Sequence, residues 1–283
     1  MRKVWFNMGI LGVIAVPVLV FIGLGAVMGI MLAIASKAFA VKKDPRIDEI
    51  SDLLPGANCG GCGFAGCGAF AEAVVEGKAS PSKCSASDEA VVGKICAIIG
   101  IEATKTVRMR AQVMCSGTPE NARKKYIYSG IPDCISAATL GGGDKLCPNG
   151  CIGLGTCVRS CVFDAISVVD GVAVVDYEKC RGCGVCVSAC PKKLIELIPF
   201  DSRHWVGCKS VENGKTTRSY CDVGCISCRI CEKSCETDAI SVNDNVAYIV
   251  YDKCVDCGAC VSKCPRGIIK SPDEILKSLA GVK

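Results

Sequence analysis

Cysteine is the residue type in this chain most suited to chemistry, because many of the cysteines stand at short, regular spacings. Three runs have the spacing C-x2-C-x2-C-x3-C, and two of them are followed directly by proline. Three thiolates from one tight loop can bind one face of an iron–sulfur cubane, whereas the fourth lies too far along the chain and ligates a neighbouring cluster. The runs are Cys180, Cys183, Cys186 and Cys190; Cys225, Cys228, Cys231 and Cys235; and Cys254, Cys257, Cys260 and Cys264.

A further group of cysteines lies nearer to the N-terminus and has a different spacing. Its loop is rich in glycine, which allows tight backbone turns around a metal core. Short helices are predicted at 69–75 and at 88–99, where apolar residues recur at helical spacing. Cys96 lies on the apolar side of the second helix, so we interpret it as a small buried residue. The group predicted to bind one [4Fe-4S] cluster is Cys59, Cys62, Cys67 and Cys84.

The C-terminal half of the chain contains an internal repeat. Residues from Cys134 to Pro191 recur at one constant offset, as the pairs Cys134 and Cys208 or Cys147 and Cys221 show. Each copy includes two short apolar segments around a turn, which predicts a β-hairpin. Each copy is therefore expected to be an α+β unit that resembles a two-cluster bacterial ferredoxin.

The ferredoxin spacing assigns the ligands of three clusters directly, because each loop of three cysteines takes its fourth ligand from the other run of the same unit. In the second unit, one cluster is predicted on Cys225, Cys228, Cys231 and Cys264, and the other on Cys254, Cys257, Cys260 and Cys235. In the first unit, one cluster is predicted on Cys180, Cys183, Cys186 and Cys161.

The remaining cluster of the first unit departs from the pattern at one position. Cys151, Cys157 and Cys190 correspond to ligands of the second unit, but Leu154 stands where the second unit has a cysteine. Cys147 is the nearest substitute, and we predict it as the fourth ligand. The alternatives are a three-iron cluster or a ligand from a more distant cysteine.

Four further cysteines have no place in these five clusters. They could together hold a sixth cluster, or they could be free thiols that stabilise loops. The sequence predicts five [4Fe-4S] clusters and allows six. The four cysteines in question are Cys115, Cys134, Cys208 and Cys221.

The composition argues against several other classes of protein. The chain has 283 residues, 25 cysteines and one histidine. Cysteines clustered at ligand spacing argue against a disulfide framework, and their successive short spacings fit zinc poorly. One histidine is too few for a Rieske centre or a bis-histidine haem. No Lys/Arg run is interleaved with aromatic residues, so no nucleic-acid partner is expected.

The N-terminal segment is long and apolar enough to cross a membrane. Residues 4–36 contain no charged residue, and about 20 residues are enough to span a bilayer. A cleaved signal peptide is the alternative, since 38–40 has an A-x-A pattern, but the apolar stretch is longer than a usual signal core. Basic residues at 37, 42, 43 and 46 outnumber those before the span. The positive-inside rule therefore predicts a single-pass protein of the cytoplasmic membrane whose cysteine-rich body is cytoplasmic.

These observations predict an α+β protein with an N-terminal transmembrane helix, a small, mostly helical four-cysteine domain and tandem ferredoxin-like units. The predicted boundaries are a transmembrane anchor at 1–40, the four-cysteine domain at 41–105, a connector at 106–133, ferredoxin-like unit 1 at 134–203, ferredoxin-like unit 2 at 204–270 and a C-terminal tail at 271–283.

The motif L-P-G-A-N-C-G-G-C-G-F-A-G-C-G-A-F-A, from Leu54 to Ala71, stands between a membrane span and ferredoxin repeats. In this order the chain resembles the B subunit of the Rnf complex. The resemblance covers nearly the whole chain, and the doubled ferredoxin tail is similar to the anaerobe-type form. It implies electron transfer from reduced ferredoxin, through clusters, to the flavin- and NAD-binding subunits of a membrane-bound, ion-translocating ferredoxin:NAD oxidoreductase.

No flavin, haem, NAD or complete catalytic site is expected on this chain itself. Gly150, Gly153 and Gly155 are crowded among cluster cysteines and do not stand between a strand and a helix, as a dinucleotide site requires. The predicted span carries no charged residue that could transport an ion, so ion transport is expected in partner subunits. A stand-alone membrane-anchored iron–sulfur oxidoreductase, or an accessory of the corrinoid-protein type, is the alternative function.

Overall fold

The computed structural model describes residues 2–39, 44–102 and 107–271. The chain forms two compact units, Met1–Pro45 and Arg46–Lys283. The predicted C-terminal tail, apart from residue 271, lies outside the described residues, as do the exact boundaries predicted at 40/41 and 105/106.

The first unit is built around one long helix, α1 (Arg2–Ala38). Its segment from Ala15 to Lys37 has a mean hydropathy of 2.7 and is not buried against other parts of the described chain. A helix satisfies its own backbone hydrogen bonds, which allows an apolar segment of this length to lie in lipid. The helix is thus long and apolar enough to cross a membrane, as the sequence predicted.

The second unit begins with a small helical domain. Its elements are α2 (Pro45–Leu53), α3 (Cys67–Val75), the 3-10 helix η1 (Pro81–Lys83) and α4 (Glu89–Ile99). Ile50, Phe70 and Ile95, one from each α-helix, are completely or almost completely buried in a common core. Gly100 ends α4 in the left-handed conformation with a φ of 81°, which glycine adopts without steric cost. The two helices predicted here are confirmed.

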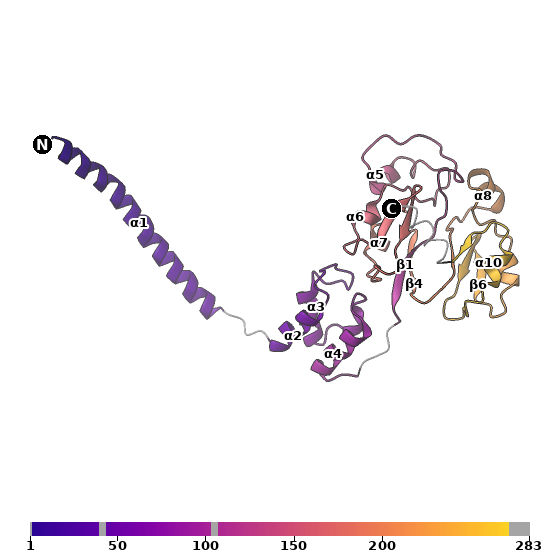
Figure 1. Cartoon of the computed structure of the whole chain (residues 1–283), viewed down its shortest axis with the longest axis horizontal. Coiled ribbons are helices and arrows are strands. Elements are labelled where there is room, and N and C mark those ends of the chain that lie inside the picture. Colours follow the sequence, from indigo (N-terminus) through magenta and orange to yellow (C-terminus); the bar gives the residue numbers. More distant parts are fainter. Residues whose placement is uncertain (1, 40–43, 103–106, 272–283) are drawn as a thin grey trace. The chain divides into compact units, whose positions relative to one another are not determined.

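The first ferredoxin-like unit consists of very short elements (Figure 1). Strands β2 (Ile166–Val169) and β3 (Val172–Val175) form the predicted antiparallel hairpin. Helices α6 (Thr156–Arg159) and α7 (Val185–Ala189) follow the two cysteine loops, and α5 (Cys134–Thr139) precedes them. Strand β4 (Ile195–Pro199) ends the unit.

The second ferredoxin-like unit repeats this arrangement. Its hairpin is β6 (Ile240–Asn243) and β7 (Val246–Ile249), and its cluster-loop helices are α9 (Ile230–Lys233) and α10 (Ala259–Lys263). Strands β5 (Trp205–Val206) and β8 (Ile269–Lys270) pair as the outer ladder, and α8 (Gly214–Tyr220) stands before the cysteine loop. The structure therefore has the α+β content that the repeat predicted.

Part of the segment predicted as a connector, residues 106–133, forms a strand in the structure. Residues 109–113 form strand β1 (Met109–Val113), which pairs with β4 in antiparallel register from Met109 opposite Pro199 to Val113 opposite Ile195. Strand β1 therefore belongs to the first ferredoxin-like unit, where it occupies the place that β5 has in the second. The alternation of apolar and polar residues from Val107 to Val113 is the sequence signal that could have found it.

Aromatic residues join the two ferredoxin-like units. Arg110 of β1 is buried, and its guanidinium lies 3.8 Å from the ring centre of Tyr177 and 5.6 Å from that of Trp205. The guanidinium also donates hydrogen bonds to Gln112 and to the carbonyl oxygen of Ser202. Tyr177 belongs to the first unit and Trp205 to the second, so this stack fixes the two units against each other.

Candidate iron–sulfur sites

Groups of four cysteines surround separate cavities in the second compact unit. Among the described residues, no group of His, Cys, Asp or Glu is spaced to bind a single metal ion. A cubane cluster requires wider separations, because its inorganic core stands between the thiolates. Cage 1, with about 370 Å³ of space between atoms, is lined by Cys59, Cys62, Cys67 and Cys84. Cage 4, with about 350 Å³, is lined by Cys225, Cys228, Cys231 and Cys264.

Two further groups follow from the mutual influence of buried thiols. Burial, with smaller contributions from Cys180, Cys183, Cys157 and Cys161, raises the pKa of Cys186 to about 12. Burial likewise raises the pKa of Cys260 to about 11, again with contributions from its group. The name cage 2 is used below for the predicted group Cys161, Cys180, Cys183 and Cys186. Cage 5 is the group Cys235, Cys254, Cys257 and Cys260.

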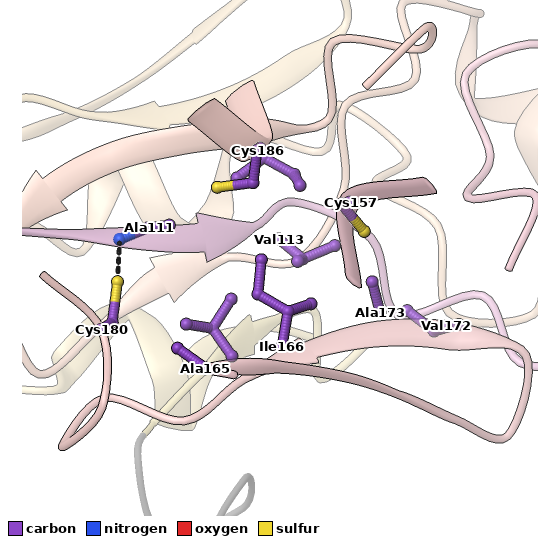
Figure 2. Packing of buried hydrophobic residues seen from close by; sticks show 11 residues of the cluster. Ala111, Val113, Cys157, Ala165, Ile166, Val172, Ala173, Cys180 and Cys186 are labelled. Carbon is purple, nitrogen blue, oxygen red and sulfur yellow. Dashed lines mark hydrogen bonds between the residues drawn. The ribbon is translucent and has the colours of Figure 1, made fainter. Parts of the chain in front are cut away.

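The core of the first ferredoxin-like unit consists largely of these thiols and small apolar side chains. Figure 2 shows Cys157, Cys180 and Cys186 among the residues of this core, and the amide of Ala111 donating to the Cys180 sulfur at 3.3 Å. The donor stands on β1, so the segment predicted as a connector contributes directly to a cage. Cysteine sulfurs are thus part of the packing and not an addition to a completed apolar core.

Backbone amides donate to several of the cage sulfurs. The Cys161 sulfur accepts a hydrogen bond from the amide of Ala165 at 3.4 Å. The equivalent Cys235 sulfur accepts one from the amide of Ala239 at 3.3 Å. Such donors stabilise negative charge on the sulfur and thereby raise the reduction potential of a bound cluster. The structure therefore has the polar surroundings that a thiolate-bound anionic cluster requires.

Cys134 lies elsewhere than the sequence predicted, since the sequence placed it in the possible sixth group with Cys115, Cys208 and Cys221. Its thiol lies close enough to Cys157 to contribute to the raised pKa of that residue. That pKa is raised to about 12, chiefly by burial and then by Cys151, Cys134 and Cys190. Leu154 leaves a gap in the cysteine loop, and helix α5 supplies a thiol from outside the loop. The name cage 3 is used below for the thiols that influence one another here, Cys134, Cys151, Cys157 and Cys190, and spacing along the chain did not identify the first of these.

A hydrogen-bond network holds Cys134 in this position. The amide of Cys134 donates to Thr156 Oγ1 at 2.8 Å, and Thr156 Oγ1 donates to Asp133 Oδ1 at 2.7 Å. Arg159 forms an ion pair with the same carboxylate at 2.9 Å, and the Ser136 amide caps α5 by donating to Asp133. Thr156 and Arg159 stand on α6, the helix that carries Cys157. The network thus attaches the start of α5 to a helix of the cluster loop.

Cys147 also lies elsewhere than the sequence predicted. It was predicted as the fourth ligand of cage 3, but it lines another cavity, which has about 400 Å³ of space between atoms. Burial, with smaller contributions from Cys115 and Cys221, raises the pKa of Cys147 to about 11. Cys134 and Cys147 thus exchange the places that the sequence gave them, because loop paths and not local spacing bring them to their neighbours. The group around this cavity, called the central cage below, is Cys115, Cys147, Cys208 and Cys221.

The N-terminal cage and the first ferredoxin-like unit approach each other closely within the second compact unit. Gly61, in the loop between Cys59 and Cys62, lies directly against the backbone carbonyl of Cys183, so any side chain at this position would collide with that oxygen. The thiol of Cys59 also contributes to the raised pKa of Cys183, after the larger effect of burial. Cages 1 and 2 are therefore neighbours.

Cys96 has a different environment. It is buried on α4 and lines none of the cavities named above. The prediction that it is a core residue agrees with its burial. It also provides a control position, since a change at Cys96 alters a thiol without altering a cage.

Three family models and several relatives match the chain. The matching models describe a putative Fe-S cluster at residues 54–86, a 4Fe-4S binding domain at 173–196 and a 4Fe-4S dicluster domain at 224–269. The chain is 44% identical over 271 residues to the B subunit of the Na(+)-translocating ferredoxin:NAD(+) oxidoreductase complex of Acetobacterium woodii; the match covers 95% of this chain and 81% of the relative. The chain belongs to the family of these B subunits.

Other members of this family match almost as extensively. The B subunit of the ion-translocating oxidoreductase complex of Methanosarcina acetivorans is 42% identical, covering 89% of this chain and 96% of the relative. The B subunit of the proton-translocating ferredoxin:NAD(+) oxidoreductase complex of Clostridium ljungdahlii is 41% identical, covering 88% and 89%. The three family models support [4Fe-4S] clusters but leave residues 87–172 and 197–223 unmatched.

Lys145 is a buried cation that no motif in the sequence marks. Its Nζ donates to the carbonyl oxygens of Gly117 at 2.6 Å and Gly171 at 3.3 Å, and its side chain lines the central cage. Burial raises the pKa of Cys151 to about 11, whereas the charge of Lys145 acts to lower it. Buried charges are normally paired, and anionic clusters would supply the opposite charge here.

We expect Lys145→Met to lower the reduction potential of the nearest cluster. In an effective dielectric of about 20, a unit charge contributes about 1–4 kcal/mol at separations of about 4–16 Å, which corresponds to about 40–170 mV for one electron. Redox titration followed by electron paramagnetic resonance (EPR) would measure the shift. Lys124→Met is the matched control, because Lys124 is exposed and pairs with Asp144 at 2.7 Å. Equal potentials in the two variants would contradict the prediction.

Proposed function

We propose that this chain is the electron-transfer subunit of a membrane-bound, ion-translocating ferredoxin:NAD oxidoreductase complex. It accepts low-potential electrons from reduced ferredoxin and passes them to partner redox subunits of the same complex. The observation that carries the proposal is the series of neighbouring four-cysteine cages in one compact unit, in a chain that belongs to this family. Each [4Fe-4S] cluster supplies, when bound, a one-electron couple that the surrounding protein tunes.

Five clusters have regular cages in this proposal. Their ligands are Cys59, Cys62, Cys67 and Cys84 in cage 1; Cys161, Cys180, Cys183 and Cys186 in cage 2; Cys134, Cys151, Cys157 and Cys190 in cage 3; Cys225, Cys228, Cys231 and Cys264 in cage 4; and Cys235, Cys254, Cys257 and Cys260 in cage 5.

The exposure of the cysteines supports a direction for the electrons. Cys228 and Cys257, both in the second ferredoxin-like unit, are the exposed cysteines of the described chain, whereas the others are buried or half-buried. A soluble carrier can approach cages 4 and 5 closely, so reduced ferredoxin is proposed to dock there. The contact of Gly61 with Cys183 supports cage 1 as the exit.

Helix α1 is proposed as a single-pass anchor that keeps the cysteine-rich body on the cytoplasmic side. The basic residues that follow the span support this orientation. Residues 4–36 carry no charge, so the Na⁺ or H⁺ that the complex moves is proposed to cross through partner subunits.

Replacing Cys183 by alanine tests the proposal in the assembled complex. The change removes a ligand of cage 2, beside cage 1, and we expect ferredoxin-dependent NAD⁺ reduction to fall to the level of membranes without this chain. Cys96→Ala is the control and should keep the normal rate. The proposal is wrong if Cys183→Ala membranes reduce NAD⁺ normally while their iron content shows that the cluster is lost.

A further inference from the structure

We propose that Cys115, Cys147, Cys208 and Cys221 hold a sixth [4Fe-4S] cluster, which links the two ferredoxin-like units. The existence of this site follows from the cage itself, whereas its role as a link rests on the proposed function. The four cysteines lie outside the residues that the family models match.

All four cysteines of the central cage line one cavity, as the four cysteines of cage 1 and those of cage 4 do. The space between atoms in the central cage is about 400 Å³, compared with about 370 Å³ in cage 1 and about 350 Å³ in cage 4. A methyl group on Gly117 would lie 3.7 Å from the Cys115 sulfur and 3.9 Å from the Cys221 sulfur. These two thiols, from different units, therefore face the same small volume.

Duplication explains why the cage has four thiols. Cys115 stands two residues after Val113, which pairs with Ile195, and Cys208 stands two residues after Val206, which pairs with Ile269. Cys115 and Cys208 are thus equivalent in the two outer ladders. Cys147 and Cys221 are equivalent in the sequence repeat. Each unit contributes one thiol of each kind, so the cage lies between two related halves.

The sulfurs of the central cage receive matching backbone hydrogen bonds. The Cys115 sulfur accepts from the amides of Gly117 at 3.5 Å and Cys151 at 3.4 Å. The Cys208 sulfur accepts from the amides of Ser210 at 3.5 Å and Cys225 at 3.4 Å. Bonds of this kind stabilise sulfur-bound negative charge in iron–sulfur sites. Two cysteines with the same pair of donors indicate a common role as ligands.

The same hydrogen bonds place the central cage between two regular cages. Cys151 belongs to cage 3 and Cys225 to cage 4, and each donates its amide directly to a thiol of the central cage. Cage 3 in turn adjoins cage 2, because the thiol of Cys157 contributes to the raised pKa of Cys186. A site at the central cage completes a single row from the second ferredoxin-like unit to the first.

One cation lines the central cage, and a second, which lines cage 4, bonds to the backbone of a central-cage residue. The ammonium of Lys145 is buried at the wall of the central cage and bonds to carbonyl oxygens. Arg266 donates to the carbonyl oxygens of Cys221 at 2.8 Å and Gly224 at 3.3 Å. A cubane with four thiolates carries a net negative charge, which would balance these cations. Four neutral thiols would leave the buried ammonium without an opposite charge.

Iron and acid-labile sulfide should be counted in the full-length chain, purified without oxygen in detergent. Six clusters give about 24 iron atoms per chain, and we expect this number in the wild-type chain. The double variant Cys115→Ala/Cys208→Ala should contain about 20, because it removes one ligand from each half of the central cage. Cys96→Ala is the matched control and should keep the wild-type content.

The outcomes separate this proposal from the proposed function. A wild-type content of about 20 iron atoms, unchanged in the double variant, overturns the sixth cluster and leaves five clusters for electron transfer. About one zinc beside about 20 iron atoms also overturns it. Iron near zero overturns both proposals. If the double variant does not fold, Cys147→Ser/Cys221→Ser gives a second test, and the wild-type count alone still decides.

Discussion

Cys134→Ala is expected to convert the cluster of cage 3 into a three-iron form or to remove it, and Leu154→Cys is expected to restore it. Cys134 is the proposed source of the thiol that the cysteine loop lacks, because Leu154 stands where the second unit has Cys228 and Cys134 lies near Cys157. Three cysteines remain in the variant, and they can bind only three corners of a cubane. A cysteine at 154 returns the fourth thiol to the loop, as in the second unit.

Iron analysis and EPR spectroscopy of anaerobically purified chains would measure this effect. Iron should fall by about one to four atoms per chain in Cys134→Ala and return in Cys134→Ala/Leu154→Cys. A three-iron signal should appear in the oxidised single variant and disappear in the double variant. Cys147→Ala serves as the comparison, because it alters the central cage. A three-iron signal from Cys147→Ala that Leu154→Cys abolishes would show that Cys147 is the ligand of cage 3.

The contrast between Cys134 and Cys183 shows how far cysteine spacing predicts a cage. Cys183 and two other ligands of cage 2 come from one loop, so their spacing along the chain fixes their arrangement around the cluster. Cys134 reaches cage 3 from helix α5 through a network with Thr156 and Arg159. Nothing in local spacing specifies that contact, which depends on how a separate loop packs against α6.

The sequence repeat does not identify all the pairs of cysteines that are equivalent in the structure. Cys134 and Cys208 share the offset of the duplication, yet Cys208 is equivalent in the structure to Cys115, which lies at a different offset. The segments between the outer ladders and the cysteine loops differ in length, so a constant offset there is a coincidence. Strand pairing, which joins residues far apart in sequence, was required to identify the true pair.

The sequence of strand β1 has the pattern of a strand, although other features of the surrounding segment favour a connector. Met109, Ala111 and Val113 alternate with polar residues, which is the pattern of a strand. Basic residues and proline in the surrounding segment favoured a connector instead. The structure shows that Arg110 is buried in a stack with Tyr177 and Trp205, so the charge that argued for a surface segment has a partner in the interior.

Removal of iron is expected to unfold both ferredoxin-like units and to leave α1 helical. The helices beside the cysteine loops have only four or five residues, and isolated helices of that length are not stable in water. Each sheet in the described chain has two strands, which is marginal without further packing. Cys157, Cys180 and Cys186 are part of the first unit's core, so loss of their common partner opens that core directly.

The effect of iron removal is expected to be large because the free energy of unfolding of such domains is small. A structural metal site contributes about 10 kcal/mol to folding, which is comparable to the whole stability of a domain, about 5–15 kcal/mol. Anaerobic chelation should therefore abolish the β-sheet contribution to the circular dichroism of the full-length chain and expose residues 107–271 to protease. Helix α1 is the internal control, because its hydrogen bonds are local and detergent shields its apolar side chains.

The pKa values of the thiols set the pH dependence of cluster reconstitution, the reverse of iron removal. Burial raises the pKa of Cys157 and that of Cys208 to about 12 in the folded chain. In the unfolded, metal-free chain the thiols are exposed and have the ordinary pKa of about 8.5, so most of them still carry protons at neutral pH. Cluster insertion requires thiolates and releases those protons. Reconstitution of the chelated chain should therefore become more favourable as the pH rises, with the recovered sheet signal as the measure. A metal-free chain that keeps its sheet signal and protease resistance would show instead that the ferredoxin-like units fold before they bind clusters.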